Sequence, residues 1–181
     1  MITKKNKKIV VEELMKKYNR TDPYGKLMDL LHLAEKENIK VVWDKRPFNV
    51  FDKSSFVGAI KTYENQTYII INENSQLSKT HTLAHLLGHF FMHKNMVESN
   101  NIPVETLETF QRTAYIHPLE WEANEFAYEL LMPEKIVRER WDKFTKIYEN
   151  KETALEVLAE SFDKSPLVMS YRLNELNIDW K

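Results

Sequence analysis

Apolar residues recur along this chain with a helical period in most segments, and with strand-like patterns in a shorter stretch between residues 39 and 71. Thr21-Asp22-Pro23 predicts the start of a helix that runs to about Glu37, because a capping side chain followed by proline is typical of a first helical turn. Helical spacing predicts further helices over about residues 9–18, 79–93, 119–131 and 133–150, and over two segments of 152–176 that are separated near residues 163–166.

Strand patterns are confined to three short segments. Residues 39–43 form one candidate strand, and residues 56–61 and 66–71 flank Tyr63-Glu64-Asn65 like the two arms of a hairpin. We therefore expect an α+β fold, with a small antiparallel sheet beside a pair of core helices and further helices at both ends. A chain of 181 residues is expected to form one domain, with residues 152–181 as a small helical tail packed on it.

Composition narrows the classes of function. The formal net charge of −1 gives no global field that would attract the chain to nucleic acid or to an anionic membrane. Cysteine is absent, so disulfides and thiolate metal sites are excluded, and any zinc must be held by histidine and carboxylate side chains. The basic first residues are followed by no apolar signal segment, and no apolar run approaches the length of a membrane span, so we expect a cytoplasmic protein.

The predicted helix 79–93 carries histidines at intervals of four residues, namely His81, His85, His89 and His93. Side chains at this spacing share one helix face, so a neighbouring pair can reach one metal ion. The segment is otherwise apolar, which predicts a buried helix whose imidazoles need partners. Gly88 in mid-helix costs about 1 kcal/mol, which indicates that something passes close to the backbone there. The alternative is a histidine-rich helix face that binds no metal.

Glu120 and Asn124 form a second pair at helical spacing, on the predicted helix 119–131. A zinc site with two histidines needs a third ligand and an open position for water. Glu120 would be that ligand, with Asn124 one turn on to orient the site. Glu122 lies about 200° round the helix from Glu120, so the two carboxylates cannot point at one ion. The alternative for Glu120 is a surface carboxylate favoured by the helix N-terminus.

The segment His85-Leu86-Leu87-Gly88-His89 is similar to the zinc-peptidase pattern H-E-x-x-H. In that pattern the glutamate takes a proton from the zinc-bound water. Leu86 stands at this position and cannot accept a proton. We therefore expect the metal cage to be kept and the general base to be missing.

Taken together, these segments resemble the ImmA/IrrE family of zinc metallopeptidases. The family pattern T-L-A-H-E-L-G-H, E-x-x-A-N-x-F-A and L-L-M-P is matched by residues 82–89 apart from Leu86, by residues 120–127 and by residues 130–133. The resemblance implies that His85, His89 and Glu120 bind Zn²⁺ and that Asn124 orients the site. It also implies a protein partner, because family members that resemble ImmA cleave helix-turn-helix repressors of mobile elements or stress regulons.

The departure at Leu86 leaves three hypotheses for function. The first is a metallopeptidase-like regulatory protein that binds a helix-turn-helix repressor and cleaves it poorly or not at all. The second is an active zinc endopeptidase in which His81 or His117 replaces the base and Tyr115 donates to the developing oxyanion. Ordinary packing or helix capping is the simpler interpretation of both histidines, and His81 stands where the family usually has an aromatic residue.

The third hypothesis is a DNA-binding module formed by the C-terminal helices, which resemble a helix-turn-helix. Residues 155–181 carry five acidic and three basic side chains, a net charge of −2. This is the wrong sign for binding phosphate, so the charge argues against nucleic acid as the partner. The tail is better interpreted as a packing or partner-recognition module.

Overall fold

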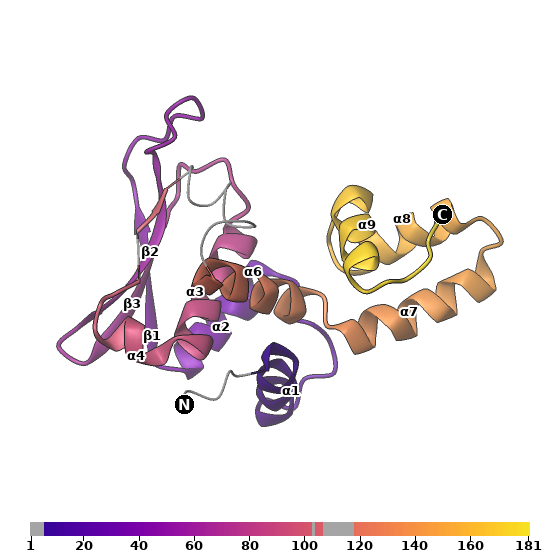
Figure 1. Cartoon of the computed structure of the whole chain (residues 1–181), viewed down its shortest axis with the longest axis horizontal. Helices are drawn as coiled ribbons and strands as arrows, with labels where there is room; N and C mark the ends of the chain where they lie inside the picture. Colours follow the sequence, from indigo (N-terminus) through magenta and orange to yellow (C-terminus); the bar gives the residue numbers. More distant parts are fainter. Residues whose placement is uncertain (1–5, 103, 107–117) are drawn as a thin grey trace.

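The computed structural model describes residues 6–102, 104–106 and 118–181. The sheet and helices α2, α3, α4 and α6 form one side of the molecule, and α7, α8 and α9 form the other (Figure 1). The helices are α1 (Lys7–Lys17), α2 (Leu27–Lys36), α3 (Lys79–Met92), α4 (Lys94–Glu98), α6 (Pro118–Leu131), α7 (Glu134–Ile147), α8 (Lys151–Ser161) and α9 (Pro166–Glu175). The strands are β1 (Ile39–Asp44), β2 (Phe56–Tyr63), β3 (Gln66–Asn72) and β4 (Glu105–Thr106).

The sheet has the strand order β1-β3-β2-β4. β2 and β3 form the predicted antiparallel hairpin, with Tyr63 opposite Gln66. The α+β class is confirmed, but the expectation of a purely antiparallel sheet is wrong, because β1 runs parallel to β3. The reason is topological: β3 returns from the hairpin into the place beside β1, so it runs antiparallel to β2 and parallel to β1.

The predicted helix start at Asp22-Pro23 is also wrong, since α2 begins at Leu27. The segment before it is held in place by tertiary contacts. Tyr24 is buried, its backbone N–H donates to the Leu130 carbonyl, and its ring lies under the Arg20 guanidinium at 4.4 Å. The hydrogen bond to α6, the burial of Tyr24 and its contact with Arg20 outweigh a local capping signal that is worth only about 1 kcal/mol.

Helix α3 is the centre of the fold. It packs against α2, β2, β3 and α6, and every residue from 82 to 89 is buried. A Cβ atom on Gly88 would lie 2.7 Å from the carbonyl oxygen of Ala123, so the backbones of α3 and α6 touch at this point. The expected close approach at Gly88 is therefore confirmed, and it is the neighbouring helix that passes there.

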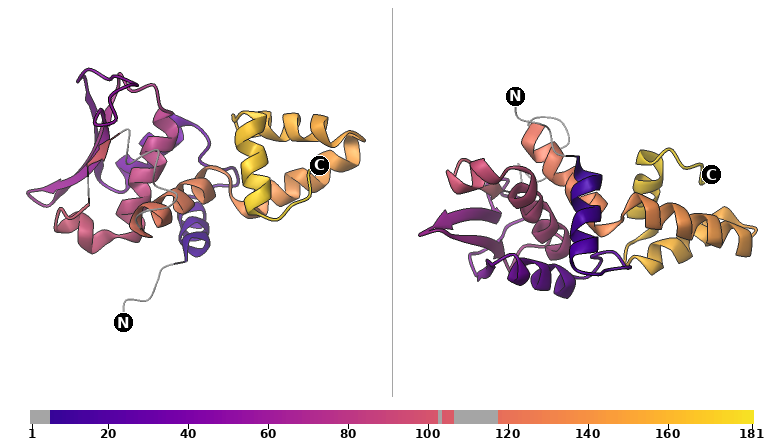
Figure 2. Two further views of the ribbon diagram at one scale, coloured as in Figure 1. Left: turned by 45° about the horizontal axis from the view of Figure 1, so that its top comes forward. Right: turned by 90° about the horizontal axis from the view of Figure 1, so that it is seen from below.

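The C-terminal helices form a separate layer. α7 leads away from the end of α6, and α8 and α9 fold back beside it (Figures 1 and 2). The predicted break in the tail is confirmed between Ser161 and Pro166, where Asp163 has a positive φ of 55°. Among the helices of the described residues, none is long and apolar enough to span a membrane.

Candidate metal centre

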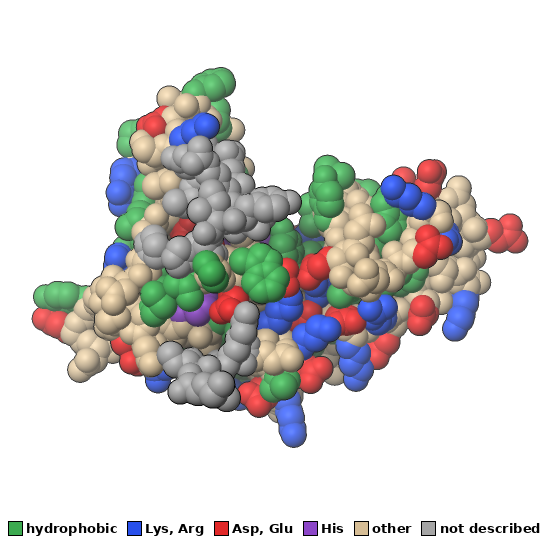
Figure 3. Space-filling view, viewed as in Figure 1, with side chains coloured by type: hydrophobic (Ala, Val, Ile, Leu, Met, Phe, Trp, Pro, Cys, Tyr) green, Lys and Arg blue, Asp and Glu red, His purple; other side chains and the backbone are tan. Residues whose placement is uncertain are grey.

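Two histidines of α3 converge on one point. The Nε2 atoms of His85 and His89 lie 3.1 Å apart, and both side chains are completely buried. The face of the molecule in Figure 3 shows only a small area of histidine. The four-residue spacing predicted from the sequence thus brings the two imidazoles together inside the protein.

Glu120 enters the cluster from the first turn of α6. Its Oε2 lies 3.1 Å from His85 Nε2 and 3.3 Å from His89 Nε2. The contact between Gly88 and Ala123 sets α6 close enough for this carboxylate to reach α3. The surface alternative for Glu120 is wrong, because only 5% of the residue is exposed.

A fourth side chain, Glu105, was missed by the sequence reasoning. It lies on the two-residue strand β4 and is fully buried, with Oε1 3.6 Å from His85 Nε2 and 3.9 Å from His89 Nε2. The ligand atoms of these four residues all lie within 4.8 Å of one another. The segment around Glu105 has no periodicity that singles it out, and only the pairing of β4 with β2 brings it to α3.

Polar side chains orient the two imidazoles from outside the cluster. His85 Nδ1–H donates to Asn124 Oδ1 at 2.9 Å, which leaves the Nε2 lone pair of a neutral His85 directed at the centre. On the other side His89 Nδ1 contacts His93 Nδ1 at 3.1 Å, and His93 Nε2 lies 3.1 Å from Glu122 Oε2. Glu122 therefore supports the site through His93, as its place round the helix from Glu120 requires.

The electrostatics of the cluster favour a positive charge at its centre. Burial lowers the pKa of His89 to about 4. Burial also acts to lower the pKa of His85, but the Glu105 and Glu120 carboxylates outweigh it and raise that pKa to about 9. For Glu120, burial is outweighed by hydrogen bonds with His85 and His89, which hold its pKa well below the usual range. Burial raises the pKa of Glu105.

The donor set fits a divalent metal ion. Within the described parts of the chain, Glu120 Oε1 is a buried oxygen with no hydrogen-bond partner, which is an unusual and costly state. Two neutral imidazoles and carboxylate oxygens, at this separation and without cysteine, are ligands that Zn²⁺ accepts. A cation would satisfy the free oxygen and replace the proton held at His85.

The remaining predicted residues divide into three cases. Leu86 is fully buried and packs against Gly58 of β2, so no proton acceptor stands at its position. His81 lies beside Tyr128, with ring centroids 5.3 Å apart, and burial lowers its pKa to about 4; it is not one of the four converging residues. Tyr115 and His117 lie outside the described residues, and their proposed roles stay predictions.

A buried helix with two histidines four residues apart, met by a glutamate from a second helix, defines a domain of the zinc-peptidase type. Residues 34–174 match the IrrE N-terminal-like domain. The chain belongs to this ImmA/IrrE family of metallopeptidase domains. It is also 32% identical over 154 residues to the "Uncharacterized immunity region protein 2" of Bacillus phage phi105, an alignment that covers 84% of this chain and 79% of the phage protein.

Proposed function

We propose that this chain is a zinc-binding regulatory member of its family that binds a helix-turn-helix repressor and cleaves it poorly or not at all. One observation carries the catalytic part of the proposal. Leu86, at the position of the general base, is buried against β2 and offers no proton acceptor. Loss of general-base catalysis reduces a rate by about 10²–10⁴-fold.

The metal part of the proposal follows from the donor set. His85, His89 and Glu120 would hold the ion, and Asn124 would fix the tautomer and the ring orientation of His85. When bound, zinc lowers the pKa of a coordinated water to about 7 and polarises carbonyl groups. This chain's own residues would hold the ion and orient its ligands, but the side chain at position 86, where the general base of the family stands, offers no proton acceptor.

The active-peptidase alternative receives little support from His81. Its pKa of about 4 leaves it neutral at pH 7, but a base this weak provides little driving force for proton transfer. Its ring packs beside Tyr128, in line with the packing interpretation. The proposal of an impaired peptidase is therefore preferred over an active one with this histidine as base.

The surface of α9 supports a protein partner over DNA. Leu167, Val168 and Tyr171 expose 63%, 37% and 66% of their surface on this helix. The sole basic residue of α9, Arg172, is buried in an ion pair with Glu129 and is not available to phosphate groups. Exposed apolar side chains without basic neighbours on the same helix are typical of protein recognition. The phage relative's name, an immunity region protein, agrees with a repressor as the partner.

The test needs a candidate helix-turn-helix repressor, to be sought among the genes next to that of this chain, because family members that resemble ImmA are often encoded beside their target. We expect calorimetry to show binding of the zinc-replete native chain, and electrophoresis of the mixture to show no cleavage above that of a Glu120→Ala control. Cleavage by the native chain that is lost in Glu120→Ala, at a rate that a restored carboxylate at position 86 does not raise, would contradict the proposed impairment. Salt-sensitive binding to duplex DNA, with no binding to the repressor, would contradict the proposed partner.

A gain of function is the complementary test. Gly58 lies opposite Glu105 across the β2–β4 pair, and Leu86 packs on Gly58, so a carboxylate at position 86 would be buried beside Glu105. The base is therefore best restored in the double variant Leu86→Glu, Glu105→Gln. We expect cleavage of the repressor to rise by about 10²-fold or more over the native chain.

A further inference from the structure

We propose that Glu105 is a fourth protein ligand, so that the metal centre of this chain is closed by protein rather than completed by water. This inference rests on the metal site of the proposed function and adds to it. Zinc sites that carry out catalysis keep one position open, whereas zinc sites with four protein ligands are structural. If Glu105 is a ligand, the ion has no position left for a water molecule, so the assignment concerns the chemistry of the centre as well as its set of ligands.

The distances have the pattern of a four-ligand site. Donor atoms placed tetrahedrally at about 2.0–2.1 Å from zinc are roughly 3.3–3.4 Å from each other. The three distances among His85, His89 and Glu120 are 3.1, 3.1 and 3.3 Å. Glu105 Oε1 lies 3.6 and 3.9 Å from the two histidine Nε2 atoms, and all four ligand atoms lie within 4.8 Å of one another, so a side-chain movement of at most roughly 1.5 Å would bring Glu105 into the tetrahedron.

The charges of the buried side chains also support Glu105 as a ligand. Glu105 and Glu120 are both buried, and an ionised carboxylate removed from water is costly unless a positive group compensates it. Two carboxylates and two neutral imidazoles neutralise a divalent ion completely. If Glu105 were ionised but did not coordinate the ion, the +1 charge of the centre and the −1 charge of this carboxylate would stand apart in a low-dielectric interior, and direct coordination is the arrangement that brings them closest.

The sheet explains why Glu105 reaches the cluster. Its cross-strand neighbour is Gly58, and a Cβ atom there would lie 3.0 Å from the Ile70 carbonyl oxygen and 3.1 Å from Leu86 Cδ1. The missing side chain at Gly58 therefore lets α3 lie close against β2. Leu86 fills the space below Gly58, and Glu105 extends from the adjacent strand toward His85. Leu86, which stands at the position of the general base, and Glu105, which would close the centre, therefore both lie at the same face of the sheet.

The test is made on the full chain loaded with Co²⁺, whose visible absorption reports the number and type of its ligands. Azide is the probe, because it binds a metal ion that has an open or water-occupied position. We expect azide to leave the spectrum of the native protein unchanged and to shift that of Glu105→Gln. We also expect Glu105→Gln to weaken Co²⁺ binding by about tenfold or more, since even residues that only orient ligands contribute 10- to 100-fold. Glu125→Gln, a change on α6 outside the cluster, is the matched control and should behave like the native chain.

Two results would overturn the assignment: an azide response of the native protein equal to that of the variant, or an azide-silent Glu105→Gln that keeps full Co²⁺ affinity. If Glu105→Gln does not fold, the native titration decides alone, since a closed centre requires it to be silent. Repressor binding, measured on the same Co²⁺-loaded native protein, separates the two proposals. If the native protein responds to azide and still binds the repressor, only the role of Glu105 is wrong. If it is silent to azide and does not bind the repressor, only the proposed partner is wrong.

Discussion

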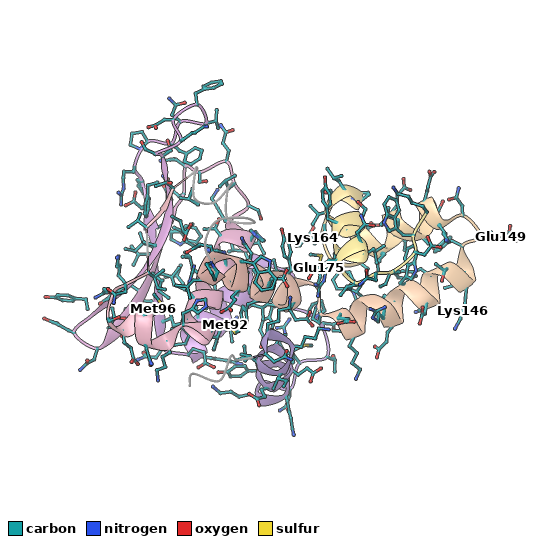
Figure 4. All side chains as sticks on the ribbon, in the orientation of Figure 1. Met92, Met96, Lys146, Glu149, Lys164 and Glu175 are labelled. Carbon is teal, nitrogen blue, oxygen red and sulfur yellow. The ribbon has the colours of Figure 1, made fainter. Side chains whose placement is uncertain are left out.

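Two clusters of charged side chains are buried in this chain, and they differ in how their charges are satisfied. At the junction of α6 and α9, Arg172 donates to Glu129 at 2.5 Å, to Glu175 at 2.8 Å and to the Met132 carbonyl at 2.9 Å. Glu175, labelled in Figure 4, is the last residue of α9. The second oxygen of Glu129 accepts the Glu134 backbone N–H at the start of α7. The buried charges of Arg172 and Glu129 are therefore satisfied by the protein's own groups.

The metal-centre cluster is built from the same kinds of atoms but is not complete. Its two carboxylates face two imidazoles, and one ligand atom from each of the four side chains lies within 4.8 Å of the others. One oxygen of Glu120 has no hydrogen-bond partner among the described residues. Burial of charge therefore does not by itself mark a functional site. The informative sign is a buried carboxylate oxygen that has no hydrogen-bond partner among the described residues and lies where four ligand atoms converge.

The largest expected effect is on metal binding, in His89→Ala. A structural zinc site is worth roughly 10–16 kcal/mol, shared among its ligands, so removing one of four should weaken zinc binding by up to about 10³-fold. Competitive titration with a chelator of known affinity measures this. His32→Ala, at an exposed histidine of α2, is the control and should bind zinc normally. Unchanged zinc affinity in His89→Ala would contradict the assignment of this cluster as a metal centre.

The second prediction concerns the complete cluster. Arg172→Ala leaves Glu129 buried without its cation, and we expect the free energy of unfolding to fall by about 3–5 kcal/mol. Denaturant unfolding of the metal-free protein measures this, and Lys151→Ala, which breaks the exposed pair with Asp179, should change little. Zinc affinity of the folded Arg172→Ala protein should be that of the native chain. A loss of zinc affinity would show that the two clusters are coupled.

The smallest of these effects is expected from Asn124→Ala. The variant removes the acceptor that fixes His85 but keeps every ligand, so zinc affinity should fall by about 10- to 100-fold. The same chelator competition resolves the difference from His89→Ala. Equal losses in the two variants would mean that Asn124 does more than orient its partner, and no loss would mean that the imidazole is oriented by packing alone.

The local parts of the centre were predictable from the sequence, and the long-range part was not. His85, His89 and Glu120 follow from helical spacing and from the family motif, because residues four apart on a helix share a face whatever the rest of the fold does. Glu105 depends on the pairing of β4 with β2, across 47 residues from Gly58, and no local pattern encodes that. The parallel β1–β3 pair and the start of α2 were missed for the same reason, since tertiary contacts decided both.

The contact between Gly88 and Ala123 has a consequence for the entropy of metal binding. The spacing of α3 and α6 is fixed where backbone meets backbone, with no side chain between them that could change rotamer. The imidazoles of α3 and the carboxylate of Glu120 are therefore preorganised by two rigid helices before any ion arrives. Little conformational freedom remains for these ligands to lose on binding, so most of the interaction energy of the ion with them would appear as affinity.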